Sequence, residues 1–358
     1  MTINNMSDIA LDQRGQEILG AVVEQYVRSG EPVGSRTLAQ KSSEHLSAAT
    51  IRNTMADLEQ LGLLEQPHTS AGRIPTELGY RVYVNNLMRG HPIARADEQF
   101  IQASLGHPVN DAAALFGQVS RVLSQLTNQI GVVITPNVSR VRLRHLEFVQ
   151  LASRRVVAIL VAETGVIHNK VFETEDEYAQ EQLDRAGRFL TETFQGMTLP
   201  ETRERIVAMM AEEKALYDRL LKDAIALAQA SVDQMPEEPG ERHVFVEGTS
   251  NLLDSPDFAD AERLKAIFRT FEEKHRILRI LNRCLEEGQP GVRVLIGSET
   301  DLPELNQCTL ITSAYGPEGQ PLGALGVLGP TRMEYAKAVA LVDYVSRFFG
   351  TLLKPYTL

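Results

Sequence analysis

Apolar residues near the start of the chain recur every three or four positions, which is the spacing of a helix with one buried face. The first such set comprises Ile18, Leu19, Val22, Val23 and Tyr26. It predicts a helix over residues 12–30, which Gly30 ends. Two shorter sets predict helices over 35–41 and 47–61, each opening on a serine that can cap it.

After these helices the pattern changes to two short strands, 63–65 and 73–74, joined by a turn that contains Gly72. A further helix over 77–88 completes the unit. Three helices followed by a small hairpin are the order of a winged helix-turn-helix, a DNA-binding module. The sequence therefore predicts a winged-helix DNA-binding domain over residues 1–90.

The rest of the chain mixes helices and strands, so we expect an α+β multidomain protein. Predicted helices cover 96–105, 111–129, 176–195, 201–232, 257–287 and 330–349, and predicted strands cover 132–135, 143–151, 155–162, 166–173, 243–247, 292–297, 308–315 and 322–328. In one parse, residues 91–141 and 238–358 form a single discontinuous α/β domain. Residues 142–237, with a three-stranded meander and two long helices, are then inserted into it.

The third predicted helix has two chemically different faces. At 100° per residue, Ile51, Met55 and Leu58 point inward. The outward face is predicted to contact DNA through Ala49, Thr50, Arg52, Asn53 and Ala56. Small residues allow close approach to a groove, Asn pairs with adenine, and Arg pairs with guanine. An ordinary solvated helix face has a similar composition, and the surrounding winged-helix order favours the DNA-reading interpretation.

Other contacts are expected from the second helix and the hairpin. The candidates are Ser35, Arg36, Thr37, Lys41, His68, Ser70, Gly72 and Arg73. Gly72 allows a tight backbone at the wing tip, and Arg73 is suited to a narrow minor groove. The hydroxyls and remaining cations are expected at phosphates. For each of these residues alone, an exposed side chain without function is the competing interpretation.

The formal net charge of −11 argues against indiscriminate binding to a polyanion. Residues 1–90 contain eight Lys and Arg against ten Asp and Glu, so this part is less acidic than the rest without being basic. DNA binding must therefore depend on the placement of a few Lys and Arg side chains on the surface of this domain, and not on its net charge.

Several other classes of protein lack support in the sequence. The longest apolar run, 156–162, is too short to span a membrane, and residues 1–14 do not resemble a secretory signal, which predicts a cytoplasmic protein. Cys284 and Cys308 have neither the number nor the spacing of a disulfide framework or a zinc site. We find no phosphate-binding loop, nucleophile elbow or paired-histidine motif, and expect no catalytic residues, metal or cofactor.

Four segments give a more specific indication. They are Val33–Leu38, Ser47–Glu59, Thr69–Thr76 and Gly79–Val84, and a fifth, Leu325–Tyr335, lies near the C-terminus. In these segments the sequence resembles the heat-inducible transcription repressor family, HrcA. The motifs are long, ordered and correctly spaced, and the resemblance covers nearly the whole chain.

This resemblance implies a winged helix, a GAF-like domain and a dimerising domain inserted in the latter. It further implies a homodimer that represses chaperone operons from an inverted-repeat operator in double-stranded DNA. The GroEL chaperonin would keep the repressor active until heat-unfolded proteins occupy it. The alternative is a winged-helix regulator whose GAF-like domain binds a small molecule, for example beside the glycines of segment 323–329.

Overall fold

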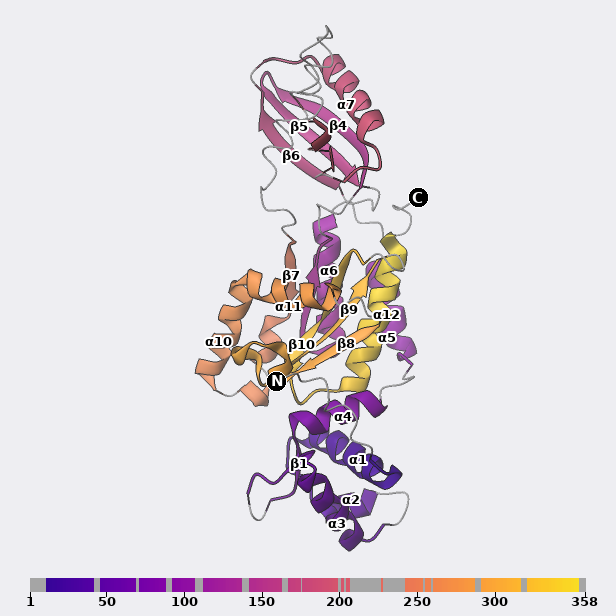
Figure 1. The fold of residues 1–358 in the computed structure, drawn as a ribbon, viewed down its shortest axis with the longest axis vertical. Coiled ribbons are helices and arrows are strands. Elements are labelled where there is room, and N and C mark those ends of the chain that lie inside the picture. Colours follow the sequence, from indigo (N-terminus) through magenta and orange to yellow (C-terminus); the bar gives the residue numbers. More distant parts are fainter. Residues whose placement is uncertain are drawn as a thin grey trace.

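The computed structural model describes residues 11–41, 46–68, 71–87, 92–106, 112–136, 142–162, 167–174, 176–198, 201–202, 204–206, 227, 242–253, 255–258, 260–286, 291–316 and 321–353. Three bodies follow one another along its long axis (Figure 1). An N-terminal helical body with a two-stranded hairpin lies at one end, a five-stranded sheet with its helices lies in the middle, and a three-stranded sheet lies at the other end.

The N-terminal body is a winged helix. Its elements are α1 (Gln13–Ser29), α2 (Ser35–Lys41), α3 (Ala48–Gln60), β1 (Leu64–Glu65), β2 (Ile74–Pro75) and α4 (Glu77–Leu87). The Asp12 carboxylate caps α1 by accepting from the Gly15 N–H at 2.7 Å. Gly30 ends α1 in the left-handed conformation at φ 70°, which a residue with a Cβ adopts reluctantly.

The predicted amphipathic faces of α1 and α3 are confirmed. Ile51, Met55 and Leu58 are buried in one cluster with the apolar side of α1. The Ser47 hydroxyl caps α3 by accepting from the Thr50 N–H at 3.1 Å. Ser35 is the first helical residue of α2 rather than a residue before it.

The middle body contains an antiparallel sheet in the order β7-β3-β10-β9-β8. The strands are β3 (Ile130–Ile134), β7 (Val244–Glu247), β8 (Val292–Ile296), β9 (Cys308–Tyr315) and β10 (Gly323–Pro330). Every residue of the central strand β10 is buried. A Cβ on Gly326 would lie 2.1 Å from the carbonyl oxygen of Ile311, so this glycine allows close strand packing.

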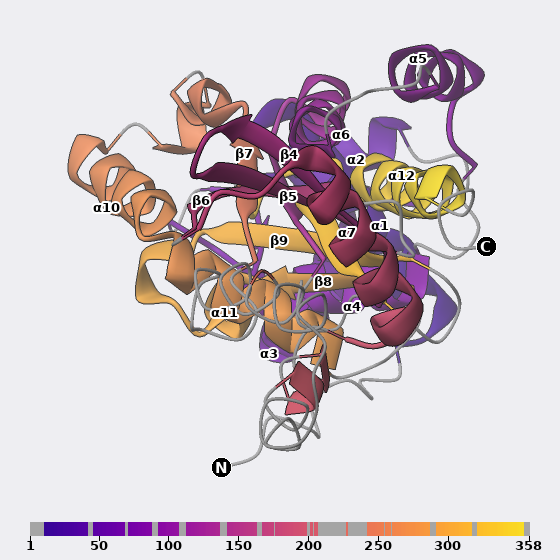
Figure 2. The ribbon, with the colours of Figure 1, turned by 90° about the horizontal axis from the view of Figure 1, so that it is seen from above.

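Helices cover both faces of this sheet (Figure 2). One side is packed by α6 (Ala112–Thr127) and α12 (Tyr335–Leu353), with α5 (Arg95–Leu105) outside α6. The other side is packed by α10 (Ala261–Glu272) and α11 (Lys274–Glu286). Short 3-10 turns connect these elements: η2 (Thr249–Leu252), η3 (Pro256–Phe258), η4 (Gly297–Thr300) and η5 (Pro303–Leu305).

The third body is an antiparallel meander with one described helix on it. It consists of β4 (Leu143–Ala152), β5 (Arg155–Ala162), β6 (Ile167–Glu173) and α7 (Gln180–Phe194). Along the chain it lies between β3 and β7, which pair directly, with Val132 opposite Val246. The middle sheet therefore closes across a segment of more than a hundred residues.

Three predicted helices are corrected. The helix expected over 257–287 is divided into η3, α10 and α11, because Glu273 adopts a non-helical ψ of 65° and ends α10. The last helix begins at Tyr335, since Pro330 extends β10 opposite Cys308. The helix expected from 176 begins at Gln180. Most of the helix predicted over 201–232, and the loop 233–240, lie outside the described residues.

Candidate DNA-binding surface

Helix α3 presents a polar face at the free end of the molecule, away from the middle sheet (Figure 1). Ala49, Arg52 and Asn53 are exposed on it, and Ala56 is half-buried. Thr50 is also half-buried, and its hydroxyl oxygen lies 2.9 Å from that of Ser47. Four of the five predicted residues therefore form one accessible strip, while the Thr50 hydroxyl is engaged at the helix cap.

The described structure gives Arg52 and Asn53 no hydrogen-bonding or ionic partner. An unpaired guanidinium keeps all five N–H donors available, and an amide keeps its donors and its acceptor. These two neighbours can each make a bidentate contact with a base edge. The polar face of α3 is therefore chemically suited to direct readout.

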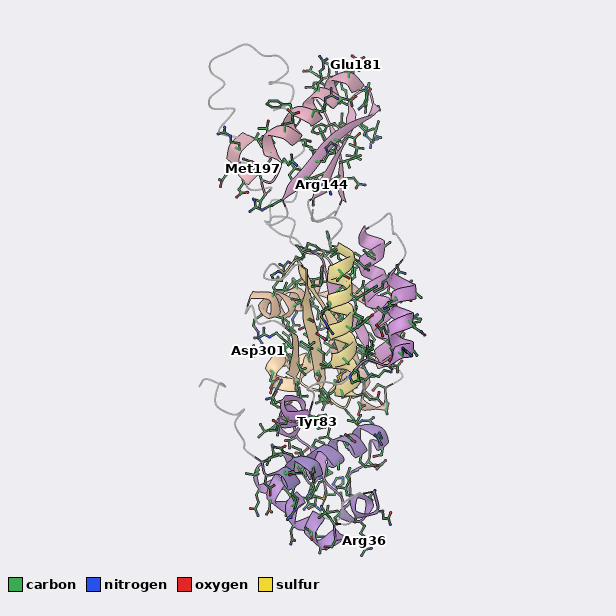
Figure 3. The ribbon with its side chains drawn as sticks, turned by 90° about the vertical axis from the view of Figure 1, so that its right-hand side faces the viewer. Arg36, Tyr83, Arg144, Glu181, Met197 and Asp301 are labelled. Carbon is green, nitrogen blue, oxygen red and sulfur yellow. The ribbon has the colours of Figure 1, made fainter. Side chains whose placement is uncertain are left out.

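Helix α2 packs against α3 and contributes the neighbouring candidates. Arg36 and Thr37 are exposed, and Ser35 is half-buried at the start of the helix. Figure 3 shows Arg36 at the outer end of the winged helix. Lys41 is the last residue of α2, and its side chain lies outside the described part of the structure.

The wing is held to the helices through the backbone. Val33 and Arg73 exchange two N–H to C=O hydrogen bonds of 2.9 Å each. Gly72 is half-buried directly against this bridge: a Cβ there would lie 2.4 Å from the carbonyl carbon and oxygen of Val33. The glycine is thus required by close backbone packing.

The Arg73 side chain turns back onto α3. Its guanidinium donates to a Glu59 carboxylate oxygen from Nε at 2.9 Å and from Nη2 at 2.8 Å, with both side chains largely covered. Arg73 therefore joins the wing to α3 in this structure, and its minor-groove contact stays a prediction. No local pattern indicates this pair, because its two residues are fourteen positions apart in the chain. His68 is exposed, and Ser70 lies outside the described residues.

The opposite side of the winged helix docks on the middle body. Tyr80 and Tyr83 of α4 lie against Tyr335 at the start of α12, with ring centroids 5.5 Å and 6.5 Å apart. Figure 3 shows Tyr83 at this junction. Burial raises the pKa of each of these phenols above its ordinary value, so all three are neutral at physiological pH.

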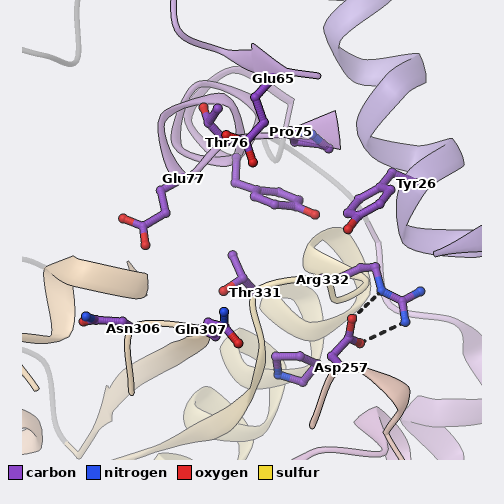
Figure 4. Close-up of a pocket in the computed structure, with 12 residues that line it drawn as sticks. Tyr26, Glu65, Pro75, Thr76, Glu77, Asp257, Asn306, Gln307, Thr331 and Arg332 are labelled. Atoms are coloured by element: carbon purple, nitrogen blue, oxygen red, sulfur yellow. Dashed lines mark hydrogen bonds and ion pairs between the residues drawn. The ribbon is translucent and has the colours of Figure 1, made fainter. Parts of the chain in front are cut away.

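Polar contacts surround the tyrosines. A cavity of about 380 Å³ lies between the winged helix and the loops of the middle body (Figure 4). Along one side, Arg332 pairs with both carboxylate oxygens of Asp257 at 2.9 Å and donates to the Val27 carbonyl at 3.3 Å. The hydrogen bonds to Asp257 raise the pKa of Arg332. Arg332, which is ion-paired within the middle body, therefore also hydrogen-bonds to the end of α1.

Elsewhere in the described part of the chain, no group of three His, Cys, Asp or Glu side chains is arranged to hold a metal ion. No helix there is long and apolar enough to cross a membrane. Cys308 is fully buried, and burial raises the pKa of its thiol to about 12.

Comparison with known families matches almost the whole chain. The family model of the HrcA protein C-terminal domain matches residues 113–339, and that of the winged helix-turn-helix transcription repressor HrcA DNA-binding domain matches residues 10–88. The chain belongs to the HrcA family of heat-inducible transcription repressors. All thirteen candidate DNA-contacting residues lie within the match to the DNA-binding model.

Individual HrcA proteins agree over the same length. The heat-inducible transcription repressor HrcA of Geobacter sulfurreducens is 40% identical over 349 residues, covering 98% of this chain and 99% of that protein. Its counterpart from Syntrophobacter fumaroxidans is 39% identical with the same coverage. A hypothetical protein of known crystal structure shares the fold at a TM-score of 0.65, with 21% identity over 97% of this chain and 99% of that chain.

Proposed function

We propose that this HrcA protein acts in the cytoplasm as a homodimer and represses chaperone operons from an inverted-repeat operator. Residues 1–90 read the DNA, residues 91–141 and 238–358 form a GAF-like domain, and residues 142–237 form an inserted dimerisation domain. The observation that carries the proposal is the exposed, unpaired Arg52 and Asn53 on α3, at the end of the molecule.

Base readout is tested by single substitutions. Arg52→Ala and Asn53→Ala should each cost roughly 1–3 kcal/mol on operator DNA and little on random DNA. Arg28→Ala is the matched control, because Arg28 is exposed on α1 and pairs only loosely with Glu24 at 3.9 Å. Lys41→Ala should weaken both DNAs alike and reduce the salt slope by about one unit.

The measurement is equilibrium binding to operator and random duplexes at several salt concentrations. Equal losses on both duplexes for Asn53→Ala would contradict readout by α3. A loss for Arg28→Ala as large as that for Arg52→Ala would show that charge alone is being measured.

Dimerisation through the inserted domain is supported by the meander face opposite α7. Phe148, Val156 and Leu160 point toward α7 and are buried with it. On the other face, Val149, Val157 and Val171 form a row across the three strands. Val171 is 44% exposed, and Val149 and Val157 are half-buried. Apolar surface of this kind typically marks an interface between proteins.

The apolar side chains of the predicted helix 201–232 are a second candidate for the dimer interface, and they lie outside the described residues: Met209, Met210, Leu216, Leu220 and Leu221. The meander row therefore supplies the sharper test. Val171→Lys should shift the protein toward monomer in light scattering, because a charge would be buried without a partner. Leu253→Lys, at a residue 60% exposed on the middle body, is the control. Deletion of residues 142–237 should also leave a monomer with poor operator affinity, and a persisting dimer would place the interface elsewhere.

Dependence on the GroEL chaperonin is supported by the path of the chain. β3 and β7 can pair only when the chain closes a loop of more than a hundred residues between them. Closing such a loop is slow, and it costs conformational entropy. β5 is uncharged and apolar from Val156 to Ala162, so intermediates that expose this segment are prone to aggregate.

We therefore expect refolded protein to lose operator binding to aggregation, and GroEL with its cochaperonin and ATP to raise the active fraction. An unfolded competitor should lower that fraction again. The readout is operator binding titrated against protein concentration. An active fraction near complete without chaperonin, and insensitive to the competitor, would refute the heat switch and leave DNA binding intact.

A further inference from the structure

The winged helix is fastened to the middle body by polar contacts that join residues far apart in the chain. Arg81 of α4 donates from Nε to a Glu299 oxygen at 2.9 Å and from Nη2 to the second Glu299 oxygen and to the Val294 carbonyl, the latter at 2.6 Å. The two side chains are only 21% and 31% exposed. A bidentate, partly covered pair restricts orientation as well as distance.

Glu299 is itself held in place. It accepts from the Ile296 N–H at 2.9 Å, within the short η4 turn that follows β8. Its carboxylate is therefore anchored to the end of β8 by a hydrogen bond that does not involve Arg81. The ion pair with this anchored carboxylate therefore restricts the orientation of α4 relative to the middle sheet.

A second contact lies beside the first. The Ser298 hydroxyl donates to Glu77, at the beginning of α4, at 2.7 Å. The intervening Gly297 has a φ of +52°, and a Cβ there would lie 2.0 Å from a Glu77 oxygen. Together with the Arg332 contact to Val27, these contacts hold the winged helix at both ends of the first turn of α4 and at the end of α1.

We propose that Arg81, through Glu299, is a positioning residue that sets which half-site spacing the repressor accepts. The inference rests on the proposed dimer and inverted repeat. Two recognition helices carried by one dimer meet two half-sites only if each α3 points in a defined direction from the dimer axis. Each base pair inserted between half-sites rotates the second site by about 34°. A winged helix held rigidly on the middle body cannot reach the rotated half-site, whereas a loosely tethered one can reorient and bind it.

The test compares full-length variants on a set of operators. The spacer between half-sites is shortened or lengthened by one and two base pairs, and a single half-site serves as reference. Wild-type protein should prefer one spacing by about 100-fold, the scale on which correctly placed linked sites gain over misplaced ones. In Arg81→Ala this preference should fall below about tenfold, with half-site affinity unchanged within about twofold.

Charge exchange and a matched control make the result specific. Arg81→Glu alone should lose spacing preference. The double variant Arg81→Glu with Glu299→Arg should recover part of it, because the exchange restores the ion pair but removes the acceptor for the Ile296 N–H. Arg347→Ala removes an exposed guanidinium that pairs with Asp343 inside α12, and should leave the spacing profile unchanged. Glu299→Gln, which keeps the size of the side chain, replaces Arg81→Ala if the latter fails to fold.

The outcomes separate this inference from the proposed function. Wild-type protein that binds a half-site as tightly as an inverted repeat would refute the dimeric operator itself. Wild-type protein with a sharp spacing preference that folded variants at Arg81 and Glu299 retain would refute the positioning role alone.

Discussion

Gly72 is the residue of the wing whose substitution has the most predictable consequence. Its backbone is not in the positive-φ region, so conformational freedom is not what requires glycine here. A Cβ would lie 2.4 Å from the Val33 carbonyl group and 2.7 Å from the carbonyl carbon of Pro32. These are backbone atoms, which cannot rotate away as a side chain can. Gly72→Ala must therefore separate the wing from the segment before α2.

The magnitude follows from the contacts that this separation breaks. The Val33–Arg73 bridge consists of two backbone hydrogen bonds of 2.9 Å. At a net value of about 0.5–1.5 kcal/mol each, their loss destabilises the closed wing by about 1–3 kcal/mol. This raises the open fraction by roughly 5- to 150-fold. Because Arg73 also joins the wing to Glu59, the wing end of the DNA-binding surface should lose its fixed position.

Amide hydrogen exchange measures this directly. The Val33 and Arg73 amides should exchange faster in Gly72→Ala by about the same factor, while the Leu19 amide inside α1 stays protected. Gly34→Ala is the matched control, because a Cβ there meets only the Thr37 hydroxyl at 3.9 Å. Equal acceleration in both variants, or none in Gly72→Ala, would refute the packing argument.

Four other outcomes are expected. Tyr335→Phe should lower the free energy of unfolding by about 1–3 kcal/mol in urea titrations, because the Tyr335 hydroxyl donates to the Thr331 carbonyl at 2.6 Å. Tyr80→Phe should leave the free energy of unfolding unchanged or raise it, because the buried Tyr80 hydroxyl has no partner among the described groups. Native Cys308 should resist iodoacetamide at pH 8, where a pKa of about 12 leaves almost no thiolate, and should react after unfolding. Gly326→Ala should unfold the middle sheet at lower urea, with circular dichroism as the readout.

Local pattern predicted the winged helix well because its helices are short, amphipathic and capped. The buried face of α3 follows from the spacing of Ile51, Met55 and Leu58, and its start follows from Ser47. Strands β9 and β10 likewise follow from two apolar runs, which predict strands over 308–315 and 322–328. In each case the deciding interactions join residues near one another in the chain, so one sequence window contains them.

Long-range contacts were not predictable in this way. Nothing local to Glu273 indicates that α10 ends there, since the break depends on how two helices pack against one sheet. The pairs Arg73–Glu59 and Arg81–Glu299 likewise join positions whose proximity exists only after folding. The sequence therefore indicated which cations were available at the DNA-binding end, and the structure shows which of them are already engaged.

That division of the cations explains how an acidic protein can bind DNA selectively. Arg73 and Arg81 are neutralised by Glu59 and Glu299, so they hold the wing and the winged helix in place. Arg36 and Arg52 lie on the outer end, and no partner neutralises them among the described residues. With few free cations, little affinity is expected from phosphates alone, so non-specific binding is expected to be weak. In the proposed dimer, selective binding then depends on correctly oriented base contacts at two half-sites, which makes the fixed position of the winged helix a condition for recognition.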